Sequence, residues 1–276
     1  MYYFYIAGRA LALFFPRKLA YSLAGLLATC QFFLSKKDRD VVIGNLSPII
    51  KNRRQREICA RKVFVNFAYY LVDFFRYDKL NTAFIKKYVR ISGINNLEEA
   101  LLAKKGAIAV TAHLGNYELA GAVTSLTGHR VNAVALSHKN KRINNFFNEQ
   151  RSVAGVNVVS ASVAIKKCFS LLKKGELVAF LGDRIFSGSG IAVDMFSRKT
   201  LLPRGPAFFA LKTGAAIMPA FFVRENKYFY HLVFEKPIDT KTFNTEEAVV
   251  KEYSAVLEKY IGKHPEQWYL FTPYWL

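Results

Sequence analysis

From Tyr88 onward, short apolar runs alternate with amphipathic stretches, and this alternation constrains the fold more than any other feature of the chain. Helical stretches of about 10–15 residues between strands are typical of βαβ units. The pattern therefore predicts an α/β fold with a mixed, largely parallel central sheet flanked by helices. The predicted strands are Tyr88–Ser92, Ala107–Thr111, Val131–Leu136, Val156–Val159, Leu177–Leu181, Ile191–Phe196, Ala216–Val223 and Tyr228–Glu235. The predicted helices are Arg53–Lys79, Leu97–Lys104, Tyr117–Leu126, Lys141–Val153, Ala161–Lys174, Gly205–Thr213 and Thr245–Ile261.

The first 34 residues are mostly apolar. Their longest uncharged run, Leu19 to Leu34, is shorter than the roughly 20 residues that a comfortable membrane span needs. It suits a helix or helical hairpin embedded in one leaflet, with Lys36, Lys37 and Arg39 at the headgroups. We predict a membrane-associated helical segment over residues 1–40 and a catalytic domain over residues 41–276. A buried helix of a soluble core is the alternative.

The chain carries a net charge of +20, from 40 Lys and Arg against 20 Asp and Glu. Such an imbalance attracts nucleic acid, anionic membranes or acidic substrates, and the charge alone does not choose among them. The three cysteines are widely spaced and form no Cys-x-x-Cys pair, which predicts free, buried thiols and no disulfide framework or structural zinc site. No cluster of metal ligands stands out, so we expect no metal.

One histidine stands where catalytic groups of α/β proteins gather. A predicted strand ends at His113, Gly115 and Asn116 form a turn, and Glu118 falls in the first turn of the next helix, with Asn116 as its N-cap. Within one helix, residues five apart lie about 140° apart, so His113 and Glu118 can meet only if His113 precedes the helix. A neutral imidazole oriented by a carboxylate can remove a proton from a hydroxyl. Because no matched Ser or Cys nucleophile is present, direct attack by the acceptor hydroxyl is favoured over an acyl-enzyme. On the residues alone, a structural role for His113 as a hydrogen-bonded residue is an equal alternative.

The stretch from Ala112 to Leu119 resembles the His-x4-Asp/Glu motif of the late lipid A acyltransferases, the lauroyl and myristoyl transferases of the lysophospholipid acyltransferase superfamily. The resemblance extends over most of the chain. It is carried by Arg61–Phe67 with Asp73, by Gly175–Asp183, by Pro203–Pro219 and by Pro265–Tyr269. Several motifs in the family's order are far more specific than one.

This resemblance implies an acyltransferase with His113 and Glu118 as catalytic residues. It implies no cofactor, an acyl carrier protein thioester or acyl-CoA as donor, and an anionic lipid A precursor as acceptor, at the cytoplasmic face of the bacterial inner membrane. It implies that Arg151 contacts the carrier protein, a phosphate or the oxyanion. It implies that Asp183 orients Arg151 or the substrate, and a cap on the next turn is the alternative for Asp183. The family often has Gln where this chain has Arg184, so the acceptor stays open, and phosphatidylinositol mannosides are the alternative.

Basic residues near the predicted site are candidates for binding the substrate. A solvated loop is the alternative for those around Pro203. The candidates are Arg184, Arg198, Lys199, Arg204 and Arg224.

Two rival functions remain open at this point. A nucleic-acid-binding protein agrees with the charge and the aromatic residues, although no recognisable motif supports it and we expect no nucleic-acid partner. A non-catalytic membrane scaffold that kept the fold is the other.

Overall fold

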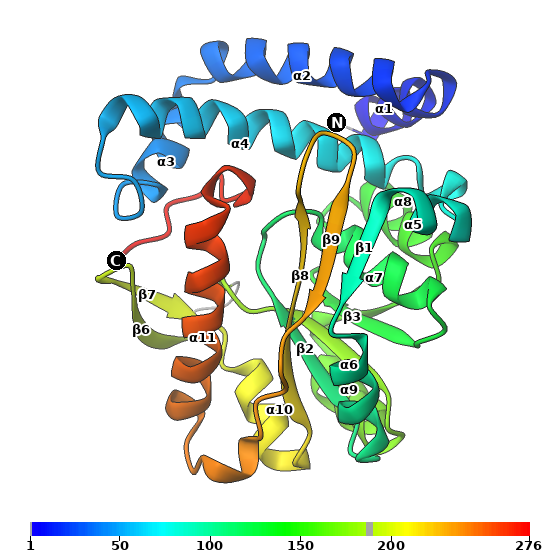
Figure 1. Ribbon diagram of the computed structural model, residues 1–276, viewed down its shortest axis with the longest axis vertical. Helices are drawn as coiled ribbons and strands as arrows, with labels where there is room; N and C mark the ends of the chain where they lie inside the picture. Colours follow the sequence, from blue (N-terminus) through cyan, green and yellow to red (C-terminus); the bar gives the residue numbers. More distant parts are fainter. Residues whose placement is uncertain (1, 186–189) are drawn as a thin grey trace.

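The computed structural model describes residues 2–185 and 190–276. Its centre is a seven-stranded sheet in the order β1-β9-β8-β2-β5-β3-β4, in which only the β8–β9 pair is antiparallel (Figure 1). The strands are β1 (Val89–Ser92), β2 (Ala107–Thr111), β3 (Val131–Ala135), β4 (Val156–Ser160), β5 (Leu177–Leu181), β8 (Ala216–Arg224) and β9 (Tyr230–Phe234). The predicted mixed, largely parallel sheet flanked by helices is confirmed.

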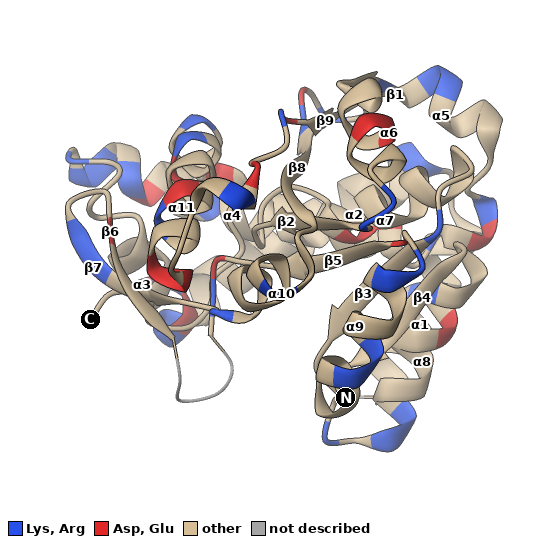
Figure 2. Ribbon diagram, turned by 90° about the horizontal axis from the view of Figure 1, so that it is seen from below, with Lys and Arg blue, Asp and Glu red and all other residues tan. Residues whose placement is uncertain are grey.

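Helices cover both faces of this sheet because its central strands are apolar on both sides. In β2, Ile108 and Val110 pack against α9 (Ala164–Lys173), α10 (Gly205–Thr213) and α11 (Glu246–Lys263). The alternate residues Ala107 and Ala109 face α6 (Ile94–Leu102), α7 (Tyr117–Leu126) and α8 (Lys141–Val153). Lys and Arg lie on the surrounding helices and loops and on β7 (Arg198–Leu202), whereas β2, β3 and β5 carry no charge (Figure 2). A strand that is buried on both faces has a continuous apolar sequence, and these strands could be predicted for that reason.

A separate helical layer lies across one end of the sheet. It contains α1 (Tyr2–Phe14), α2 (Arg17–Leu34), α3 (Lys36–Asn45) and α4 (Arg53–Phe74), with α2 lying along α4 (Figure 1). The apolar segment forms two helices, α1 and α2, that are joined at Phe15 and Pro16. In the part of the chain that the structure describes, no helix has the length and hydropathy to cross a membrane. Residue 40 falls within α3, and the division into a membrane segment and a catalytic domain stays a prediction.

Four elements differ from the sequence expectations. The helix predicted to continue to Lys79 ends at Phe74 and is followed by a short 3-10 turn, Tyr77–Lys79. The helices α3 and α5 (Thr82–Tyr88) were not predicted, because neither has a pronounced apolar stripe. The strand β6 (Ile191–Met195) pairs with β7 (Arg198–Leu202), which was interpreted as a basic loop because it begins with two cations.

The three cysteines are free, as expected, but only two are buried. Burial raises the pKa of Cys59 to about 12 and that of Cys168 to about 11. Cys30 is exposed on α2. A thiol-directed label at neutral pH therefore reacts selectively with Cys30, because the thiolate is the reactive form.

Candidate active site

His113 and Asp183 meet at the carboxyl edge of the sheet because their strands are neighbours. β2 and β5 are paired in parallel with Thr111 opposite Leu181, so each side chain lies two residues beyond the end of its strand. The Gly182 amide donates to the Thr111 carbonyl at 2.7 Å and extends this pairing toward the site. Parallel strands present such residues at one edge, where ligands of open α/β sheets bind.

The turn after His113 is held by tight backbone contacts. Gly115 has φ +62°, and a Cβ atom at this position would lie 2.1 Å from the Phe222 carbonyl oxygen, so the turn requires glycine. Asn116 caps α7 by accepting from the Leu119 amide at 3.1 Å, which confirms the predicted cap. His113 therefore precedes the helix, and Glu118 lies in its first turn.

Asp183 is the carboxylate that binds the imidazole at Nδ1. Its side chain is fully buried, and its Oδ1 lies 2.8 Å from His113 Nδ1. Its Oδ2 accepts from the His113 backbone amide at 2.9 Å and from Trp268 Nε1 at 3.1 Å. Because a carboxylate only accepts, Nδ1 carries the ring proton and Nε2 is the basic nitrogen. This geometry assigns the orienting role to Asp183, whereas the sequence analysis had given it to Glu118.

The charge of Asp183 is stabilised although the group is buried. Burial by itself would raise the pKa of Asp183, but the charge and the hydrogen bonds of His113, with the bond from Trp268, hold this pKa below its ordinary value. The carboxylate is therefore ionised at neutral pH. A buried anion beside an imidazole is an arrangement that stabilises the charged form of the ring.

Glu118 instead forms an ion pair with Arg151 of α8. Arg151 Nε lies 3.0 and 3.1 Å from the two carboxylate oxygens, and Nη2 donates to the same group. Both side chains are nearly buried, with exposed fractions of 11% for Arg151 and 12% for Glu118. Burial opposes the charge of Arg151, but Glu118 raises the pKa of Arg151 above its ordinary value. Such a two-pronged pair fixes the guanidinium in one orientation. Asp183 was expected to orient Arg151. In the structure Glu118 binds Arg151, and Asp183 binds His113.

The predicted basic residues are divided among four places. Arg224 is buried with Asp73 and Tyr21, and it bonds Tyr21 at 3.0 Å and Asp73 at 3.3 Å. Arg204 forms two hydrogen bonds with Glu246 on α11, at 2.8 and 3.0 Å. Arg198 and Lys199 are exposed on β7, and Arg184 follows Asp183 directly and is half-buried. No substrate role for these five residues follows from the geometry.

The C-terminal segment completes the site. Trp268 donates to Asp183, and the Tyr269 amide donates to the His113 carbonyl at 2.7 Å. The Tyr117 ring lies edge-on to the imidazole, with ring centroids 5.4 Å apart. The sequence signals for Trp268 and Asp183 were their places in the Pro265–Tyr269 and Gly175–Asp183 motifs, but neither motif indicated that Asp183 binds the imidazole. Across residues 2–185 and 190–276, no group of three or more His, Cys, Asp or Glu side chains is arranged to hold a metal ion.

Comparison with known proteins decides the family. All of residues 1–276 match the family described as bacterial lipid A biosynthesis acyltransferase. The chain belongs to this family.

Relatives of known name fall into two groups. The phosphatidylinositol mannoside acyltransferases of Mycobacterium tuberculosis (strain H37Rv) and Mycolicibacterium smegmatis are 27% identical over 190 residues and 24% identical over 220 residues. These alignments cover 67% and 78% of this chain, and 60% and 72% of the relatives. The lipid A biosynthesis palmitoleoyltransferase of Escherichia coli K12 is 25% identical over 187 residues, 67% of this chain and 60% of that protein. The chain thus spans about 60% of the length of the M. tuberculosis and E. coli relatives that it matches.

Among solved structures, the 1-acyl-sn-glycerophosphate acyltransferase PlsC from Thermotoga maritima matches with a TM-score of 0.45 and 15% identity. The match covers 92% of this chain and 99% of that chain.

Proposed function

We propose that this member of the lipid A acyltransferase family transfers a fatty-acyl group from a thioester, on acyl carrier protein or coenzyme A, to a hydroxyl of a glycolipid. The observation that carries the proposal is the buried Asp183 bound to Nδ1 of His113, which makes Nε2 the base. The match of the whole chain to an acyltransferase family supports the reaction class.

In the proposed reaction, His113 Nε2 takes the proton of the acceptor hydroxyl as its oxygen attacks the thioester carbonyl carbon. The tetrahedral intermediate then collapses, the carbon–sulfur bond breaks, and the imidazolium returns the proton to the leaving thiolate. Asp183 stabilises the imidazolium. Arg151, held by Glu118, supplies a fixed positive charge for the oxyanion or for a phosphate of the donor. No covalent enzyme intermediate is required.

The acceptor belongs to the class of anionic glycolipids. The named relatives include phosphatidylinositol mannoside acyltransferases and a lipid A biosynthesis palmitoleoyltransferase, and they support phosphatidylinositol mannosides and lipid A precursors equally as acceptors for this chain. A protein of net charge +20 suits an anionic acceptor and an acidic carrier protein.

Exposed apolar side chains on α2 support a membrane location. They recur at steps of three and four residues and form one stripe: Leu19, Leu23, Leu26, Leu27, Cys30, Phe33 and Leu34. We call these seven residues the α2 stripe. Leu27 and Leu34 are 70% and 85% exposed. An apolar helix face with Lys36 and Lys37 directly beyond it suits a helix lying in the headgroup region of an anionic bilayer. We place this layer at the cytoplasmic face of the bacterial inner membrane.

The test of catalysis measures transfer of a labelled acyl group from acyl carrier protein, and separately from acyl-CoA, into a bacterial lipid extract. Wild type should transfer, and His113→Ala should lose about 10²–10⁴-fold in rate, as expected for a general base. His129→Ala is the matched control, because His129 precedes β3 and so lies at the opposite edge of the sheet. Equal activity of the two variants, or no transfer by folded wild type from either donor, would refute the proposal and favour a scaffold.

A further inference from the structure

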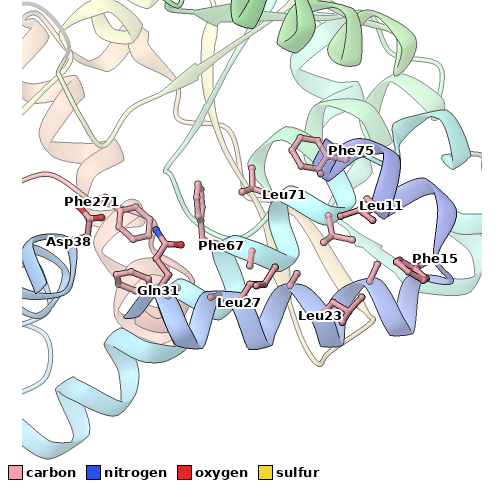
Figure 3. Close-up of a pocket in the computed structure, with 18 residues that line it drawn as sticks. Leu11, Phe15, Leu23, Leu27, Gln31, Asp38, Phe67, Leu71, Phe75 and Phe271 are labelled. Atoms are coloured by element: carbon pink, nitrogen blue, oxygen red, sulfur yellow. The ribbon is translucent and has the colours of Figure 1, made fainter. Parts of the chain in front are cut away.

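An elongated cavity of about 340 Å³ lies between α1, α2 and α4 (Figure 3). α2 lines it from Ala20 to Gln31, and α4 with its C-cap residue lines it from Phe64 to Phe75, on both sides at steps of three and four residues. At 1.5 Å per residue, each of these walls is about 16 Å long. The cavity exists because the α2 wall alternates leucines with Ala20, Ala24 and Ala28, whose small side chains leave the space between the helices unfilled.

The two ends of the cavity differ in character. Gln31 and Asp38 lie at one end, near Phe271, whereas Leu11 and Phe15 lie at the other (Figure 3). Lys36 and Lys37 follow the polar end in the chain and are exposed. A narrow apolar volume with one polar end beside cations matches a single hydrocarbon chain attached to an anionic headgroup.

The long rim of the cavity is shared with the α2 stripe. Leu23 and Leu27 line the cavity and are also exposed, so the cavity opens onto the face that we propose lies in the bilayer. We infer that the cavity binds one acyl chain of a bilayer lipid, which enters sideways from the membrane. This inference rests on the proposed membrane docking.

The position of the cavity relative to His113 favours a bilayer lipid over the donor's acyl group. Phe67 lines the cavity and stacks on Tyr70, Tyr70 stacks on Tyr117, and Tyr117 contacts the His113 ring. The centroid separations along this series are 5.5, 5.2 and 5.4 Å. Two aromatic layers therefore separate the cavity from the imidazole. The thioester of a reacting donor must lie close to His113, and its acyl chain could reach the cavity only by passing these two layers, so we assign the cavity to a chain that is not being transferred.

The test uses photochemical crosslinking to vesicles of phosphatidylethanolamine and phosphatidylglycerol. A trace of phosphatidylglycerol carries a diazirine midway along one acyl chain, and mass spectrometry locates the adducts. We expect adducts on Phe64 and Val72 of α4 and on Phe75 directly after it, which line the cavity and are 2 to 7% exposed. A lipid that only touches the surface would label Leu26 and Phe33 instead. A parallel experiment presents the same photoreactive chain on acyl carrier protein.

Two variants sharpen this test. Ala24→Phe fills the cavity and should lower these adducts about tenfold, which corresponds to about 1.4 kcal/mol and lies within the usual cost of overfilling a packed space. Leu26→Phe, on the exposed side of the same helix, should leave them unchanged. An environment-sensitive fluorophore on Cys30 reports docking in every sample.

The outcomes are distinguishable. Docking at Cys30 without α4 adducts, or α4 adducts from the acyl carrier protein alone, would overturn the cavity inference and leave the proposed acyltransferase intact. Absence of docking would overturn both the membrane location and the inference. The wild-type adduct map decides the question even if Ala24→Phe does not fold.

Discussion

Replacing Asp183 by Asn tests the proposed base most sharply, because the exchange keeps the shape of the side chain and removes its charge. The Asp183 carboxylate accepts from His113 Nδ1, the His113 amide and Trp268 Nε1. An Asn side chain offers one oxygen, so its NH₂ group would face either His113 Nδ1, or both the His113 amide and Trp268 Nε1. The imidazole then loses the partner that fixes its tautomer and stabilises its charged form.

The expected loss follows from these contacts. A general base contributes about 10²–10⁴ in rate, which is about 2.7–5.4 kcal/mol at 1.36 kcal/mol per factor of ten. We expect Asp183→Asn to lose about 10³-fold in the rate of the chemical step. At least one buried donor is also left without an acceptor, and this lowers the free energy of unfolding by about 1–3 kcal/mol.

The assay is single-turnover acyl transfer, combined with urea unfolding to show that each variant is folded at the assay temperature. Asp194→Asn is the control, since Asp194 is exposed on β6. The double variant His113→Ala/Asp183→Asn should be no slower than His113→Ala alone, because residues that act as one unit are not additive. Activity of Asp183→Asn within about tenfold of wild type, with His113→Ala inactive, would refute the orienting role, since a general base contributes more than that.

Three further predictions follow from the charged groups. Glu118→Gln should slow transfer by about 10²-fold, because it releases Arg151 from its fixed orientation. The free energy of unfolding should fall by less than the barrier to transfer rises. Added salt should not restore the rate, and transfer at the wild-type rate would exclude this role for Glu118. Asp73→Asn should lower the free energy of unfolding by about 3–5 kcal/mol in urea titrations, because it leaves the buried charge of Arg224 without its carboxylate, and a loss below about 1 kcal/mol would contradict this. Since the pKa of Asp183 is lower in the folded chain than its unfolded value of about 3.9, Asp183 stabilises the fold above that pH. The free energy of unfolding of wild type should therefore fall more than that of Asp183→Asn as the pH falls from about 5 to about 3. Equal losses in the two proteins would contradict a lowered pKa for Asp183.

Most strands could be predicted from the sequence because burial on both faces leaves a strong local signal. β2 and β5 were predicted with their observed ends, as were the turn after His113 and the Asn116 cap. The partner of the imidazole could not be predicted in the same way. β2 and β5 are adjacent in the sheet but separated in the chain by β3 and β4, and strand order is not a local property. Only that order brings Asp183 to His113.

Long-range pairing also explains the other differences. Glu118 has the spacing that suggests contact with His113, but the strongest partner for its charge is Arg151 on the next helix along the chain. Arg224 ends a strand and was therefore assigned to the substrate cleft. Its actual partner, Asp73, lies on α4, and a sequence pattern cannot show that this helix crosses the end of the sheet.

The same crossing links the helical layer to the catalytic turn. Asp73 binds Tyr21 of α2 at 2.6 Å and Arg17 of α2 at 3.3 Å, and it accepts from Asn116 at 3.4 Å. Asn116 caps the helix that begins directly after the His113 turn. The helix α2, which we propose lies at the membrane, is therefore bonded through one buried carboxylate to the turn that positions the proposed base. A hydroxyl presented from the bilayer surface would thus meet a base whose position is fixed relative to that surface.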